Sequence, residues 1–142
     1  MLLILFNFKN KDMQAGKYYV GDLCYVLHDR WDEVCDLIIK DNVCLDGEFE
    51  LKDGTQFAIY GTAHGDGHYP DQRGNGYPVD SGSIGCVLVD SITKGELDES
   101  LGNIHDFKED FETGEDDGLI QIGDVEIDTK GEEEDEEEDE DY

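Results

Sequence analysis

The order of apolar and polar residues predicts a chain built mainly from β-strands. Residues 2–8 form a short apolar run, which indicates a first strand. Residues 18–27 form an aromatic and β-branched run around Gly21 and Asp22, typical of one strand with a bend or bulge at the glycine. Residues 84–89 are apolar on both faces, so we expect a central strand there.

Two further segments read as β-hairpins. Residues 48–52 and 55–60 alternate around Asp53 and Gly54, a pair that favours a two-residue type I′ turn. Residues 118–128 alternate on both sides of a Gly-Asp turn, which predicts a second hairpin near the end of the chain.

Helical spacing occurs in two places. Residues 29–41 carry an apolar stripe at i, i+3, i+4 and i+7, with Asp29 as the expected N-cap, and predict the main helix. The members of the stripe are Trp31, Val34, Cys35 and Ile38. Residues 103–117 have a weaker apolar pattern at i, i+3 and i+7 and are expected to be partly helical.

Together these segments predict an α+β fold that is mostly β. We expect an antiparallel sheet or small sandwich, with the helix at about 29–41 covering one face. Residues 1–130 form a single β-rich domain, of which 95–130 is the acidic part, and residues 131–142 are expected to be a disordered tail.

Charge changes this picture more than any other feature. The formal net charge is −28, of which residues 1–94 contribute −7 and residues 95–142 contribute −21. The tail holds ten consecutive acids, which cannot bury apolar area and repel one another. They are Glu132, Glu133, Glu134, Asp135, Glu136, Glu137, Glu138, Asp139, Glu140 and Asp141.

This charge limits the possible partners. Contacts to phosphate require Lys and Arg, so the composition argues against direct binding to nucleic acid or to an anionic membrane. The tail is either a solubility device or an electrostatic lure that occupies the basic groove of a nucleic-acid-binding protein. The apolar start is too short for a signal sequence or a membrane span, and an intracellular protein is expected.

The glycine-rich segment at residues 61–82 is the most unusual part of the sequence. His64, Asp66 and His68 alternate, so in an extended strand they would project to one side and, with Asp80 or Asp71, could hold a divalent metal ion. The alternative is a turn-rich hairpin whose aspartates cap backbone amides. No cofactor is expected apart from this candidate metal.

Motifs for catalysis are weak. The four cysteines have no C-x-x-C spacing and are expected to be buried thiols, and neither Ser81 nor Ser83 lies in a G-x-S-x-G turn. No phosphate-binding glycine loop with a lysine is present. His28 and His105 are isolated in the sequence and are expected at the surface. The sequence therefore favours a protein that is not an enzyme.

Two segments carry a resemblance. Gly21-Asp-Leu-Cys-Tyr25 is followed by Trp31, and Gly65-Asp-Gly-His-Tyr69 is followed by Val79-Asp-Ser-Gly-Ser-Ile-Gly85. Residues 18–89 thereby resemble a loose group of small proteins from phages, large DNA viruses and bacteria with the pattern GDxCY…W…GDGxY…VDSGxIG. The resemblance implies a viral or bacterial origin and no particular activity. It marks Asp22, Asp66, Tyr69 and Asp80, either as a site or as turns and their caps.

Three functions remain open at this point. The leading hypothesis is a viral or phage interaction protein that inhibits a basic, nucleic-acid-binding partner by mimicking the charge of DNA. The second is a metal-binding domain or small hydrolase that uses residues 61–82, with Asp22, Tyr69 and Asp71 as further motif residues. The third is a structural or assembly protein of a virion.

Overall fold

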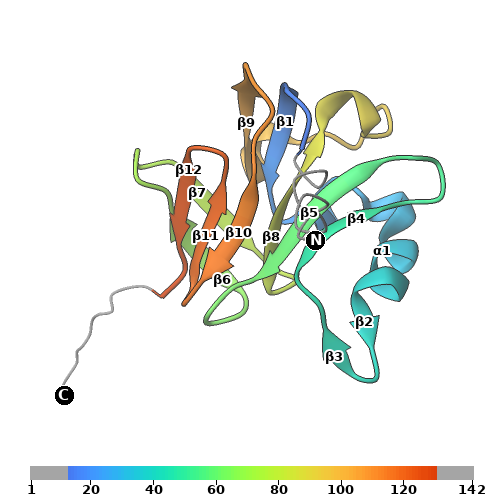
Figure 1. Cartoon of the computed structure of the whole chain (residues 1–142), viewed down its shortest axis with the longest axis horizontal. Coiled ribbons are helices and arrows are strands. Elements are labelled where there is room, and N and C mark those ends of the chain that lie inside the picture. The colour runs from blue at the N-terminus through green and yellow to red at the C-terminus, as the bar shows by residue number, and fades with distance from the viewer. Residues whose placement is uncertain (1–12, 131–142) are drawn as a thin grey trace, which may run out of the picture.

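A five-stranded antiparallel sheet with the order β4-β5-β8-β1-β9 forms the middle layer of the computed structural model, which describes residues 13–130 (Figure 1). Its strands are β1 (Gly16–Gly21), β4 (Gly47–Glu50), β5 (Gln56–Gly61), β8 (Ser83–Leu88) and β9 (Gly102–Phe107). The predicted mostly-β antiparallel fold is confirmed. The strand predicted at residues 2–8 and the acidic tail at 131–142 lie outside the described residues.

The central strands are buried on both faces because their side chains alternate between two cores. In β1, Tyr18 and Val20 point into one core while Tyr19 points into the other. In β5, Phe57 joins the second core and Ala58 the first. β8 lies in the middle of the sheet between β5 and β1, as its uninterrupted apolar sequence predicts.

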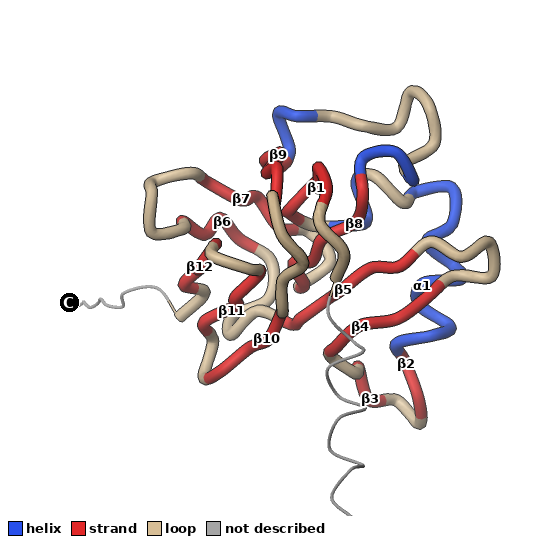
Figure 2. Tube along the Cα trace, turned by 45° about the horizontal axis from the view of Figure 1, so that its top comes forward, coloured by secondary structure: helices blue, strands red, loops and turns tan. Residues whose placement is uncertain are grey.

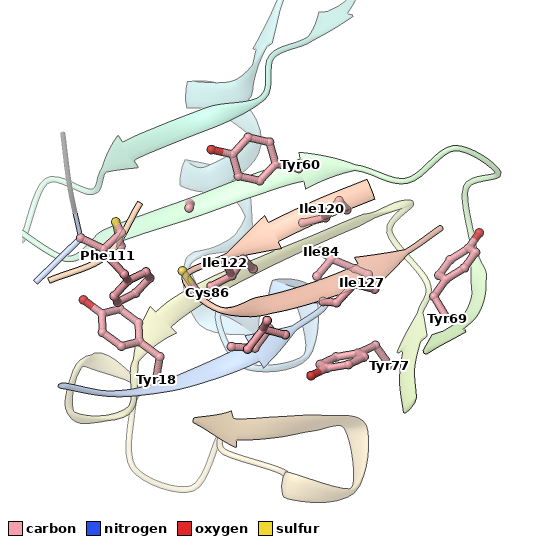
Figure 3. Close-up of a cluster of buried hydrophobic side chains, with 14 of the residues drawn as sticks. Tyr18, Tyr60, Tyr69, Tyr77, Ile84, Cys86, Phe111, Ile120, Ile122 and Ile127 are labelled. Atoms are coloured by element: carbon pink, nitrogen blue, oxygen red, sulfur yellow. The ribbon is translucent and has the colours of Figure 1, made fainter. Parts of the chain in front are cut away.

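A second layer of strands covers the first core. It consists of a three-stranded antiparallel sheet and a two-stranded hairpin. Their strands are β10 (Thr113–Asp116), β11 (Leu119–Ile122), β12 (Val125–Asp128), β6 (Gly67–Pro70) and β7 (Gly76–Val79). Figure 3 shows Ile120, Ile122 and Ile127 from this layer facing Ile84 and Cys86 of β8. The hairpin predicted at 118–128 is therefore present and supplies much of the core.

Helix α1 (Trp31–Ile38) covers the second core on the opposite face of the central sheet (Figure 2). The helix is shorter than the predicted 29–41. Asp29 does not cap it, because its carboxylate instead accepts a hydrogen bond of 2.6 Å from the Thr93 hydroxyl. At the other end Ile39 is extended and begins a short hairpin of β2 (Ile39–Lys40) and β3 (Val43–Cys44).

The turn between β4 and β5 differs from the expected two-residue turn. The Leu51 amide donates to the Thr55 carbonyl at 2.8 Å, and the Gly54 amide donates to the Leu51 carbonyl at 2.9 Å. Gly54 has a φ of +93°, so the loop is a three-residue turn that places its last residue in the left-handed region. Asp53 accepts from the Thr55 amide at 2.9 Å instead of occupying a type I′ position.

Two other expectations are wrong, the first because of a local hydrogen bond and the second because of long-range strand pairing. The strand predicted over 18–27 ends at Gly21, and Leu23–Tyr25 form a 3-10 turn because the Asp22 carboxylate accepts from the Cys24 amide. The helical spacing at 103–117 is overridden by β9, which pairs with β1 along six residues. Among residues 13–130 no helix has the length and apolar character needed to cross a membrane.

Candidate functional site

The residues of the GDxCY and VDSG segments meet around one buried carboxylate. Asp22 is fully buried at the end of β1. Its Oδ2 accepts from the backbone amides of Asp80 and Ser81 at 2.7 and 2.6 Å. Its Oδ1 accepts from the Cys24 amide at 3.0 Å and from the Ser81 hydroxyl at 2.8 Å. We call this arrangement the Asp22 clamp; it fixes the turn between β7 and β8 to the end of β1.

A ring of polar side chains lies on the solvent side of the clamp. The Tyr25 hydroxyl donates to Asp80 Oδ2 at 2.9 Å, and the hydroxyl oxygens of Ser81 and Ser83 are 2.8 Å apart. Asp80 and Ser81 are exposed, while Ser83 is half-buried. The residues that the sequence pattern singles out in these two segments are therefore brought together, although 58 positions separate Asp22 from Asp80.

The chemistry of the clamp favours positioning over nucleophilic attack. Burial, followed by the contact with Asp22, raises the pKa of the Cys24 thiol to about 12, so the reactive thiolate is scarce at neutral pH. Burial and the hydrogen bond to Asp80 raise the pKa of Tyr25 above its usual value. The hydroxyl of Ser81 is bonded to Asp22 and to Ser83, and in the described chain its hydrogen-bond partners include no imidazole.

The predicted metal site does not form. His64, Asp66 and His68 are exposed, and the His64 ring bonds to the Lys130 carbonyl at 2.9 Å. Asp80 lies at the clamp and bonds to Tyr25 instead. Among residues 13–130, no group of three or more His, Cys, Asp or Glu side chains is placed to hold a metal ion.

Backbone geometry explains this correction. The prediction required an extended strand from residue 64 to residue 68. Gly65 has a φ of +76° and residues 63–66 form bends, so the strand begins only at Gly67 and the alternation of side chains is lost. Tyr69 then turns into the core, where its hydroxyl donates to the Gly65 carbonyl at 2.9 Å.

Asp71 is a buried cap for the turn of the β6–β7 hairpin, as the turn-rich alternative predicts. Its Oδ1 accepts from the amides of Arg73 and Asn75 at 2.8 and 3.0 Å. Its Oδ2 accepts from the Asn75 side chain at 3.0 Å and from the Tyr77 hydroxyl at 2.7 Å. Burial raises the pKa of Asp71, but these hydrogen bonds outweigh burial and hold the pKa below its usual value.

His105 extends this network, so its predicted place at the surface is wrong. It is half-buried on β9, and its Nε2 lies 3.0 Å from the Tyr77 hydroxyl. Because that hydroxyl donates to the Asp71 carboxylate, its oxygen accepts from the Nε2–H of His105. Burial lowers the pKa of His105 below its usual 6.5. Only the pairing of β9 with β1 brings His105 to the hairpin, and no local sequence signal predicts it.

The His105 pKa gives a test of this network. Because the folded pKa lies below 6.5, the unfolded chain binds more protons as the pH falls below 6.5, and stability decreases. We expect the free energy of unfolding in urea to fall between pH 7 and pH 5, and to fall less in His105→Gln. Equal pH dependence in the two proteins would contradict the assignment. Asp71 lowers the free energy of unfolding only at lower pH, near and below 3.8, because its folded pKa lies below that value.

An apolar groove of about 260 Å³ lies beside the Asp22 clamp. We call it the α1 groove. Helix α1, the β2–β3 hairpin, the end of β5 and the turn at residues 81–83 surround it. Its lining is made of Trp31, Cys35, Ile38, Ile39, Cys44, Leu45, Asp46, Ile59, Gly61, Ser81, Gly82 and Ser83. The predicted apolar stripe of the helix is thus divided, with Val34 in the core and Trp31 and Cys35 at the groove.

The cysteines also differ from expectation. Of the four cysteines, which all lie within the described residues, only Cys86 is buried; Cys24 and Cys35 are half-buried and Cys44 is exposed. All four are free thiols. Cys35 and Cys44 line the α1 groove, and burial raises the pKa of Cys35 above its usual value.

The outer side of the β10–β12 sheet is acidic. Antiparallel register places Asp116, Glu126 and Asp128 on the side away from the core, where all three are exposed. We call these three residues the acidic face. Basic side chains occur at its two ends, where Lys130 pairs with Asp117 at 2.8 Å and Arg73 pairs with Asp124 at 2.9 Å. The ion pairs within residues 13–130 include none of the three acidic-face carboxylates.

Comparison with known proteins adds no further assignment. No family model, no curated protein sequence and no solved structure matches the chain. Function is therefore argued from the acidic face, the Asp22 clamp and the α1 groove.

Proposed function

We propose that the protein binds a basic, nucleic-acid-binding partner and blocks it by presenting carboxylates where that partner binds phosphates. The observation that carries this proposal is the acidic face. Three exposed carboxylates share one side of a rigid sheet, and the run of ten acids begins two residues after Lys130. The resemblance to phage and viral proteins supports the same proposal, because a phage or virus benefits when a host nucleic-acid-binding protein is inhibited.

The sheet geometry favours recognition over simple solubility. Residues at i and i+2 of a strand lie about 6.6 Å apart on one face, and neighbouring strands lie about 4.8 Å apart. The carboxylates of Glu126 and Asp128 follow the first spacing, and Asp116 extends the face across β11 to β10. Because the sheet already fixes the backbone of this array, docking of a basic surface costs less conformational entropy than it would on a mobile chain. Each charge pair therefore contributes more to the binding free energy.

Displacement of DNA from basic domains tests the proposal. A panel of helix-turn-helix domains is bound to fluorescein-labelled duplex DNA at 150 mM salt, and the full chain is added while anisotropy is measured. We expect displacement from at least one domain. Neutralising the face with Asp116→Asn, Glu126→Gln and Asp128→Asn should raise the half-displacing concentration about tenfold, since three charge pairs of about 0.5 kcal/mol each are lost.

The control keeps the net charge of that variant while changing other acids. Asp41→Asn, Asp90→Asn and Glu99→Gln also remove three exposed carboxylates, and this protein should displace DNA within about twofold of the parent. An equal loss in both variants would show that only net charge matters. A second control measures how much of the chain is needed to displace a basic protein such as cytochrome c from an anionic resin. If that concentration equals the one that displaces a helix-turn-helix domain from DNA, mimicry is not specific.

A further inference from the structure

Exposed apolar side chains are concentrated at one place on the molecule. Residues 13–130 contain four exposed large hydrophobic side chains, and three of them lie on or next to the β2–β3 hairpin. Ile39 is 45% exposed, Val43 is 56% exposed and Leu45 is 39% exposed. Ile39 and Leu45 also line the α1 groove. Apolar surface gathered around a hollow marks an interaction site, whereas scattered exposed hydrophobic residues do not.

The two ends of the α1 groove differ in polarity. Trp31, Cys35 and Ile59 form its apolar part, from the helix and β5. The other end is formed by the turn of residues 81–83, which the Asp22 clamp holds through two backbone amides and one hydroxyl. The groove is therefore preformed, and a ligand would pay little to organise it.

Charge identifies the occupant. Asp46 lines the groove, and Asp32 and Asp36 are exposed on α1 beside it. Burial is the main cause of the raised pKa of the Cys35 thiol, and the charges of Asp32 and Asp36 raise it further. A second copy of a chain with a net charge of −28 would be repelled from this surface. A positively charged segment would be attracted to it.

We propose that the α1 groove receives one large apolar side chain of the basic partner, with Lys or Arg residues on both sides of it. The flanking cations contact Asp46 and Asp36, and the Ile39 and Leu45 side chains lie beside the buried anchor. This arrangement of an apolar centre with a charged rim is usual in protein interfaces. The inference rests on the proposed function, because it names a second contact of the same partner.

Trp31 provides a direct measurement, since it is the only tryptophan in the chain and lines the groove. The probes are two amidated peptides of equal charge, Lys-Lys-Phe-Lys-Lys and Lys-Lys-Gly-Lys-Lys, titrated into the full chain with excitation at 295 nm. We expect the phenylalanine peptide to bind about 10–100-fold more tightly and to shift the Trp31 emission, because only this peptide buries an apolar side chain.

Two glycine variants separate the groove from the rest of the surface. A Cβ at Gly61 would meet only Asp46 Oδ1 at 3.7 Å and the Gly82 carbonyl at 3.9 Å, so Gly61→Val fills the groove without a clash at Cβ. A Cβ at Gly114 on the outer side of β10 would meet nothing within 4 Å. Gly61→Val should remove the preference for the phenylalanine peptide, and Gly114→Val should keep it.

The outcomes that overturn the inference are distinct from failure of charge mimicry, which the DNA displacement assay measures separately. Equal binding of both peptides with no change at Trp31 would leave charge attraction intact and refute the groove. If the Trp31 emission changes with protein concentration in the absence of peptide, a second copy of the chain is the occupant of the groove. If the double variant Leu3→Ser/Leu5→Ser changes the Trp31 emission without any peptide, the chain's own N-terminal segment is the occupant of the groove. Either result would also refute the proposal.

Discussion

Replacing Asp22 by alanine is expected to lower the free energy of unfolding by about 3–5 kcal/mol, enough to unfold a substantial fraction of a typical domain of this size. The fully buried carboxylate accepts four hydrogen bonds, three from backbone amides and one from the Ser81 hydroxyl. Alanine removes the acceptor of the three backbone amides, while the Ser81 hydroxyl keeps Ser83 as a partner. Each unsatisfied buried donor costs about 1–3 kcal/mol where water does not reach it. Urea unfolding monitored by circular dichroism measures the loss.

Asp22→Asn tests whether the acceptors or the volume matter. Asparagine has the same shape but offers one acceptor oxygen and a donating amide in place of the second oxygen. In either orientation the NH2 group would face at least one backbone N–H that the carboxylate now accepts, that of Cys24 or those of Asp80 and Ser81. We therefore expect a loss of about 2–4 kcal/mol even though the volume is unchanged.

The neighbouring Asp80 supplies the matched control. It belongs to the same turn but is exposed, and its carboxylate accepts from Tyr25 at 2.9 Å. Asp80→Asn keeps an acceptor oxygen, so the free energy of unfolding should change by less than about 1 kcal/mol. If Asp22→Ala and Asp80→Asn have similar effects, the Asp22 clamp does not hold the turn.

The sequence predicts the parts of this fold that depend on local alternation. The strands at 56–61, 83–88 and 119–128 alternate or remain apolar in agreement with the layer that each one occupies. Their burial is a property of each segment, so a pattern of period two is sufficient to find them. Helix α1 is found for the same reason, although its ends are set by contacts of Asp29 and Ile39 with other segments.

The candidate site could be predicted only in part. The pattern marks Asp22 and Asp80, yet no local rule shows that one is a buried acceptor and the other an exposed partner of Tyr25. The metal prediction failed because the φ of Gly65 interrupts the strand that it required. The α1 groove arises where a helix, a hairpin and a turn meet, and the linear order of residues contains no sign of that meeting.

Neutralising the ten acids of residues 132–141 is expected to reduce the association rate constant with a basic partner by about 10–100-fold at low salt. The variant keeps the full chain length, with each Glu replaced by Gln and each Asp by Asn, and its net charge falls from −28 to −18. Surface plasmon resonance against the helix-turn-helix domain that is displaced most readily from DNA measures the rate constants.

The salt dependence and the dissociation rate separate the tail from the folded domain. Exposed charges farther apart than about 10 Å are screened at 0.1 M salt, so an effect of the tail on encounter should fade as salt is added. Dissociation breaks close contacts, which we assign to the acidic face and the α1 groove. The dissociation rate constant of the neutral-tail variant should therefore stay within about threefold of the parent.

A shuffled tail completes the argument. The same ten acids in a different order should retain fast association, because attraction at long range depends on charge and not on sequence. If shuffling slows association as much as neutralisation does, residues 132–141 are read as a specific motif and the lure mechanism fails. If instead the neutral-tail variant changes only the dissociation rate constant, the tail belongs to the bound interface. Only a loss confined to association assigns encounter to the tail and retention to the acidic face and the α1 groove.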